Sequence, residues 1–169
     1  MAEKTDIASF EVQAIIDVFN HDKTLAPHCR RVGELLDDRM IEISRFYWSY
    51  WTAMGKFPEL ENPENIEMAV QRTAAFIADR MHNIDGFEWT KYLTRQVTDS
   101  CKRGIPLEHV HAASTRTNAY TMQLLSETCD PKTDDCNELA KAIMTGTGLE
   151  LSIMARCYTS YHAELNAER

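Results

Sequence analysis

Residues that break helices are scarce in this sequence. Six glycines and five prolines among 169 residues suit a single domain of long helices with few turns. Long apolar runs are absent too, and none approaches the roughly 20 residues that a membrane span requires. The first residues include Glu3 and Asp6 and lack the apolar core of a secretion signal. We therefore expect a soluble, cytoplasmic protein without a membrane span.

Positive charge and cysteine are both limited. Lys and Arg total 18 against 26 Asp and Glu, a formal net charge of −8 that argues against nucleic acid or an anionic membrane as the main partner. Five cysteines, an odd number without paired spacing, are typical of reduced thiols in a cytosolic protein. Cys129 and Cys136 are close enough in sequence to bridge across a loop, but the reduced form is expected.

Motifs of catalysis and of metal binding are missing or incomplete. No two histidines are four residues apart, and neither a nucleophile elbow nor a glycine-rich phosphate loop is present. Glu108 and His111 form one Glu-x-x-His pair, the motif that di-iron bundles place on a helix, but such a site needs a second pair. The nearest equivalent, Asp79 with His82, has Asp in place of Glu. We expect no enzyme, and a di-iron carboxylate bundle remains an alternative.

Apolar residues recur at helical spacing along almost the whole chain, and no segment has the periodicity of a strand. This pattern predicts an all-α protein of about seven helices, over residues 7–19, 27–54, 63–82, 89–100, 107–126 and 137–169, with a bend or a new start at Asp37-Asp38. Asn62 before Pro63 marks a helix start, and Asp134 or Asp135 is expected to cap the last helix. Because residues 161–169 lack a stop signal, we expect a longer protein to continue beyond them.

Three glycines have a predicted structural role. Lys102 and Arg103 suit the last turn of one helix, Gly104 suits its left-handed end, and Pro106 opens the next helix. Such a tight corner builds the floor of the pocket in globin-like folds. Gly146 and Gly148 each cost about 1 kcal/mol inside a helix, so they are expected to let another helix approach closely.

Aromatic residues cluster in Phe46-Tyr47-Trp48-Ser49-Tyr50-Trp51. Five rings in six residues cannot all face one core, so some are expected to line the interior and others a second apolar surface. The segment is interpreted either as core plus a subunit contact or as a pocket wall. In a pocket, a Tyr hydroxyl would donate a hydrogen bond to the ligand.

In their order, these features resemble those of the sensor globins, the globin-coupled sensor and protoglobin group, over roughly Thr24 to Tyr161. The similar segments are Phe46-Tyr47 (Phe-Tyr in the family), Phe57-Pro58-Glu59-Leu60 (Pro-Glu-Leu), Gln71, Gly104-Ile105-Pro106 (Gly-Leu-Pro), Asn118-Ala119-Tyr120 (Gly-Ala-Tyr) and Glu150 to Tyr158 (an Asp-to-Tyr stretch). The resemblance implies a globin-like helical sandwich. It also implies an N-terminal helical extension over residues 1–23, a sensor domain over 24–169, and a ligand pocket with Phe46, Tyr47, Gln71 and Ser100.

The family pattern is His, three further residues and then Gly, and the His is the proximal heme ligand. With Gly104 as that Gly, the position of the His is occupied by Ser100. A Ser hydroxyl is a poor iron ligand, whereas imidazole or thiolate is a good one. Three interpretations follow. The domain is a heme-free globin, or heme is held by His109 or His111 on the next helix, or Cys101 supplies a thiolate after a rotation by one residue.

The family's domains form the N-terminal sensory part of chemoreceptors, cyclic-dinucleotide cyclases and kinases. The resemblance therefore implies a homodimer formed through the last two helices, a C-terminal output domain as partner and a small ligand in the pocket. The residues expected at the dimer interface are Gly146, Gly148, Leu149, Ile153 and Met154. A heme-free adaptor that only partner proteins recognise is a further alternative.

Overall fold

The computed structural model describes residues 2–167, with side chains described from residue 11 onward. Its α-helices are α1 (Ala2–Phe19), α2 (Leu25–Leu35), α3 (Met40–Met54), α4 (Pro63–His82), α5 (Glu88–Lys102), α6 (Leu107–Thr128) and α7 (Cys136–Ala167), and two 3-10 turns are η1 (Asp37–Arg39) and η2 (Pro58–Glu61). The prediction of an all-α protein of seven helices is confirmed, and residues 2–167 contain no strand. None of these helices is long and apolar enough to cross a bilayer.

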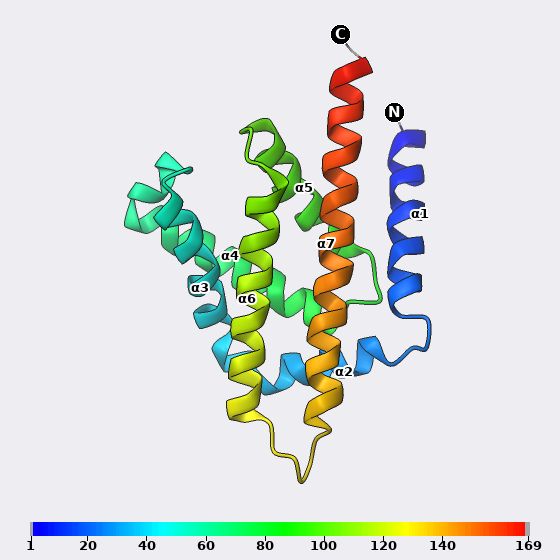
Figure 1. Ribbon diagram of the computed structural model, residues 1–169, viewed down its shortest axis with the longest axis vertical. Coiled ribbons are helices and arrows are strands. Elements are labelled where there is room, and N and C mark those ends of the chain that lie inside the picture. Colours follow the sequence, from blue (N-terminus) through cyan, green and yellow to red (C-terminus); the bar gives the residue numbers. More distant parts are fainter. Residues whose placement is uncertain (1, 168–169) are drawn as a thin grey trace.

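The helices do not form one bundle of parallel rods. Figure 1 shows α6 and α7 as an antiparallel hairpin, with α2 crossing it near its base, α3 to one side, and α4 running from that side behind α6 toward α7. The predicted N-terminal extension, α1, lies along α7. Ile16 of α1 is fully buried, and Glu11 forms an ion pair with Arg156 of α7.

Local signals set the helix boundaries where the sequence predicts them. Asn62 accepts a hydrogen bond from the Glu64 amide at 2.9 Å and caps α4, and Asp135 accepts one from the Glu138 amide at 3.2 Å and caps α7. Gly104 has a φ of +67°, which an L side chain rarely adopts, and it ends α5 as predicted. The predicted break at Asp37 is the turn η1, which separates α2 from α3.

The two glycines of α7 permit close approach, but to helices of the same chain. A Cβ on Gly146 would lie 3.1 Å from Ile84 and 3.9 Å from the Cys29 sulfur of α2, and one on Gly148 would lie 3.1 Å from the ring of Phe19 of α1. The other residues expected at the dimer interface, Leu149, Ile153 and Met154, are buried within one protomer. Gly146, Leu149, Ile153 and Met154 are therefore covered by the chain itself, whereas Gly148 is half-buried.

Cys29 lies where α2 crosses α7. Its thiol is buried and lies 3.8 Å from the carbonyl oxygen of Ala142. Burial raises the pKa of the Cys29 thiol to about 11. The uncharged Cys29 sulfur is therefore buried at the point where α2 and α7 cross.

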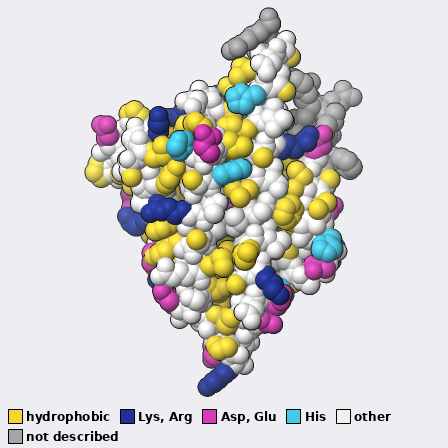
Figure 2. Space-filling view, in the orientation of Figure 1, with side chains coloured by type: hydrophobic (Ala, Val, Ile, Leu, Met, Phe, Trp, Pro, Cys, Tyr) yellow, Lys and Arg dark blue, Asp and Glu magenta, His cyan; other side chains and the backbone are white. Residues whose placement is uncertain are grey.

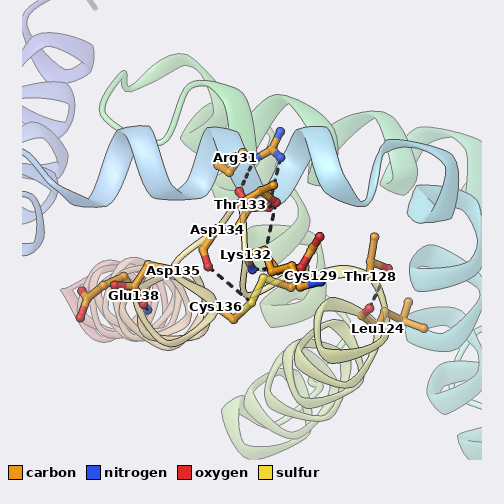
Figure 3. Close-up of a disulfide and its surroundings, with 11 residues drawn as sticks. Arg31, Leu124, Thr128, Cys129, Lys132, Thr133, Asp134, Asp135, Cys136 and Glu138 are labelled. Carbon is orange, nitrogen blue, oxygen red and sulfur yellow. Dashed lines mark hydrogen bonds and ion pairs between the residues drawn. A yellow bond between two sulfur atoms is a disulfide. The ribbon is translucent and has the colours of Figure 1, made fainter.

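The expectation that all cysteines are reduced is wrong at one pair. Cys129 and Cys136 form a disulfide across the loop between α6 and α7, with their Cα atoms 6.0 Å apart (Figure 3). A tight turn that begins at Asp130 brings the two cysteines together, although they are seven residues apart in the sequence. The Asp130 side chain stabilises this turn by accepting a hydrogen bond from the Lys132 amide. Cys29, Cys101 and Cys157 are free thiols.

The same loop is also held by α2. Arg31 donates to both carboxylate oxygens of Asp134, at 2.7 Å and 3.2 Å (Figure 3). These hydrogen bonds from Arg31 lower the pKa of the Asp134 carboxyl. The turn of the hairpin is thus fixed both to itself and to the crossing helix.

Removing the disulfide should lower the free energy of unfolding by about 2–3 kcal/mol, because a loop of this length loses that much chain entropy in the cross-linked unfolded state. Urea unfolding of a Cys129→Ser/Cys136→Ser variant checks this. Cys157→Ser, which removes an unpaired thiol, is the matched control. A midpoint equal to that of the control would contradict the prediction.

The buried Cys29 thiol should make stability fall between about pH 9 and pH 11. In this range the unfolded chain loses the thiol proton while the folded protein keeps it, so the free energy of unfolding decreases as the pH rises, by up to about 2–3 kcal/mol. Urea midpoints measured across this range should fall less steeply for Cys29→Ala than for the unchanged protein. Parallel profiles would show that another group is responsible.

Candidate functional site

A cavity of about 410 Å³ lies among α3, α4, α5, α6, α7 and η2. Its volume falls within the range of small-molecule sites, about 300–1,000 Å³. Aromatic side chains form much of the wall: Tyr47, Trp48, Trp51, Phe57, Phe76 and Tyr92. Of the aromatic residues in the 46–51 cluster, Tyr47, Trp48 and Trp51 line the cavity and Phe46 and Tyr50 do not.

The inner end of the cavity is polar. Arg80 of α4 forms an ion pair with Glu150 of α7, and both side chains are more than nine-tenths buried. Arg80 also donates to the Asn118 side chain at 3.4 Å, and Ser114 donates to Glu150 at 3.4 Å. All four residues line the cavity, so α4, α6 and α7 meet there through one hydrogen-bonded network.

Two features of this inner end bear on binding. The Nε atom of Arg80 is buried and has no hydrogen-bond partner within the described part of the chain. Tyr47 faces the same space, and burial raises the pKa of its phenol well above the ordinary value, so the hydroxyl stays protonated. The inner end therefore presents a cationic donor and a neutral hydroxyl.

The outer end reaches the surface between α4, η2 and the end of α5. Its exposed lining residues are Glu59, Met68, Arg72, Gln96, Asp99 and Arg103. Arg103 pairs with Glu59 at 2.7 Å and lies over the Phe57 ring, 5.0 Å from its centroid. Acidic and basic side chains alternate here, so the entrance has no strong field of one sign.

Of the four residues predicted for the pocket, two line the cavity. Tyr47 and Ser100 do, and the Ser100 hydroxyl donates to the Gln96 carbonyl at 3.0 Å. Phe46 stacks on Tyr120 outside the cavity, with 4.1 Å between ring centroids. Gln71 is exposed and donates to Glu67 at 2.9 Å. Phe46 and Gln71 are each next in sequence to a residue that does line the cavity. Because consecutive side chains on a helix point about 100° apart, an error of one position is enough to turn the predicted side chain away from the cavity.

None of the three residues predicted as alternative heme ligands lines the cavity. Val110 does, so His109 and His111 on either side of it point elsewhere. His109 Nδ1 lies 3.0 Å from the Tyr50 hydroxyl, and His111 Nε2 is buried without a partner among the described residues. Cys101, one residue beyond Ser100, is buried and burial raises the pKa of its thiol.

The lining residues do not fit a heme held through imidazole or thiolate, because no His or Cys is among them. A di-iron set is not formed either. Residues 11–167 contain no group of three or more His, Cys, Asp or Glu side chains placed to hold a metal ion. Glu108 and Asp79, the carboxylates of the two candidate pairs, are both exposed.

Sequence reasoning missed the polar network. A signal was present, because Arg80 and Glu150 are charged residues on apolar helix faces: Ile77 and Met81 flank Arg80, and Gly146 and Met154 lie one turn from Glu150. A charge inside such a stripe is rarely tolerated without a partner. Residues of opposite charge on the apolar faces of two helices therefore favour a buried ion pair. Only the fold shows that Arg80 and Glu150 are in contact.

Comparisons with known proteins give no match: no family model fits the sequence, and no curated protein or solved structure is significantly similar to it.

Replacing Arg80 by Met should destabilise the protein by about 3–5 kcal/mol, because the Glu150 carboxylate is left buried and unpaired. The double variant Arg80→Met/Glu150→Leu should regain most of this loss, since it removes both charges. The exposed pair Arg45–Glu67 is the matched control, and Arg45→Met should cost less than about 1 kcal/mol. Urea unfolding of the four proteins checks this, and a double variant no more stable than Arg80→Met would contradict it.

Proposed function

We propose that the chain is a heme-free sensory domain of globin type, in which a ligand in the cavity regulates an output module. The observation that carries this proposal is that the polar end of the cavity is built largely on the α6–α7 hairpin. Ser114 and Asn118 come from α6, Glu150 comes from α7, and all three line a space of ligand size. A ligand there contacts both helices of the hairpin at once.

The resemblance to sensor globins supports the globin part of the proposal. Residues of α3 to α7 line the cavity, and Tyr47 and Ser100, two of the four residues that the resemblance places in the pocket, are among them. The heme-free part is supported by the chemistry of the lining, which includes neither imidazole nor thiol.

The proposed mechanism is a shift between two packings of the hairpin. A ligand changes an equilibrium only by as much as its affinity differs between the two states. Here the difference would come from the network of Arg80, Glu150, Ser114 and Asn118, which joins α4 to both hairpin helices. A small displacement of Glu150 would move α7, the helix through which the domain is proposed to act on its output module.

The proposal includes a homodimer that forms on the outer face of the hairpin. Because Leu149, Ile153 and Met154 are buried, exposed residues would make this contact. Met144 of α7 is one, with 62% of its surface exposed. Figure 2 shows further apolar side chains along the face that α6 and α7 form.

Filling the cavity should imitate a bound ligand. Thr117 of α6 is buried and lines the cavity, so Thr117→Phe places a ring inside it. We expect amide hydrogen exchange in α7 to slow by several-fold and the dimer dissociation constant to change in the same variant. Thr115→Phe, an identical substitution at an exposed position of α6, is the matched control.

Hydrogen exchange followed by mass spectrometry and analytical ultracentrifugation measure the two effects. If Thr117→Phe and Thr115→Phe behave alike in both measurements, occupancy of the cavity does not reach the hairpin and the proposed function is wrong.

A further inference from the structure

We infer that the cavity binds an uncharged aromatic molecule that carries a hydrogen-bond acceptor, such as a carbonyl group, and that Arg80 holds this acceptor. The inference rests on the proposed function and adds to it the chemical class of the ligand. The unpartnered Nε–H of a deeply buried Arg80 is the observation from which it starts.

Arg80 has donors to spare. A guanidinium carries five N–H groups, and Arg80 uses one toward Glu150 and one toward Asn118. Its Nε–H is buried and has no partner in the described part of the chain, and Arg80 itself is one of the residues that line the cavity. A buried donor without a partner has lost its hydrogen bonds to water and gained none in return, and the cost is larger when the donor is charged. A ligand acceptor would remove this cost.

The charge of the inner end selects against ions. Glu150 already neutralises Arg80, and both side chains are buried. A ligand carboxylate would therefore meet the Glu150 carboxylate at close range and would lose its water without a free cation in return. A ligand ammonium would meet Arg80 in the same way. A neutral group that accepts hydrogen bonds avoids both costs.

The walls favour an aromatic body. Phe76 and Tyr92 stack on each other with 4.8 Å between centroids, and the Trp51 ring meets the Phe57 ring edge-on at 5.3 Å. All four rings line the cavity, so a flat ring entering it finds both faces and edges to pack against. Flexible aliphatic chains would gain the same burial but would lose more conformational freedom.

Three isosteric probes separate these contributions. They are 2-acetylnaphthalene, which has a carbonyl; 2-isopropenylnaphthalene, in which a methylene replaces the carbonyl oxygen; and 2-naphthoate, which has a carboxylate. Equilibrium dialysis at neutral pH with the unchanged protein measures their affinities. We expect 2-acetylnaphthalene to bind about tenfold or more tightly than either of the others, because a hydrogen bond to a charged donor is worth that much.

The same measurement on Arg80→Met/Glu150→Leu tests the role of Arg80. This variant keeps the aromatic walls, and we expect it to bind 2-acetylnaphthalene and 2-isopropenylnaphthalene equally. If the variant does not fold, the comparison of the three probes on the unchanged protein still decides the inference. Affinities that do not distinguish the ketone from the alkene, or no binding of any probe, would overturn it.

Decanoate and hemin complete the set. Tighter binding of decanoate would overturn the inferred ligand class while leaving a heme-free, ligand-binding sensor in place. A Soret band on addition of hemin would overturn the heme-free part of the proposed function as well. The proposed function fails separately, through identical behaviour of Thr117→Phe and Thr115→Phe. The two failures are therefore distinguishable.

Discussion

The buried ion pair between Arg80 and Glu150 is the interaction on which the arrangement of this protein depends. Two charges taken out of water must stay together, because separating them in a low-dielectric interior costs several kcal/mol. The pair thus sets the distance between α4 and α7 and fixes where the inner end of the cavity lies. Apolar contacts between the same helices could slide by a turn, but an ion pair with hydrogen bonds to α6 cannot.

Much of the fold could be predicted from local sequence signals. Asn62, Gly104 and Asp135 act within a few residues of themselves, so their roles do not depend on the rest of the molecule. Cys129 and Cys136 were wrongly predicted to be reduced, because that prediction came from the expected cellular compartment and not from the geometry of the loop. The proximity of Cys129 and Cys136 comes from the turn between them, which the spacing had already suggested.

The candidate site was harder to predict, because it depends on which face each helix turns inward. Tyr47 and Ser100, which were predicted to lie in the pocket, line the cavity, whereas Phe46 and Gln71 only adjoin residues that line it. An error of one position changes the direction of a side chain by about 100°. Periodicity defines an apolar stripe but not its edges, and these residues lie at the edges. Gly146 was predicted to lie at a dimer interface, but it packs against Ile84 and Cys29 of its own chain. A small residue on a long helix indicates close packing without indicating which segment packs against it.

The doubly fastened turn at the base of the α6–α7 hairpin has a mechanical consequence. The Cys129–Cys136 bridge closes that turn and the Arg31–Asp134 pair holds it against α2, so under the proposed mechanism it would act as a fulcrum. Glu150 lies about two thirds of the way from this fulcrum toward Tyr158, whose hydroxyl donates to the Ile105 carbonyl. Under the proposed mechanism, a tilt of α7 that began at Glu150 would therefore grow with distance along the helix. The largest displacement would fall on the C-terminal turns of α7, which extend above the rest of the molecule in Figure 1.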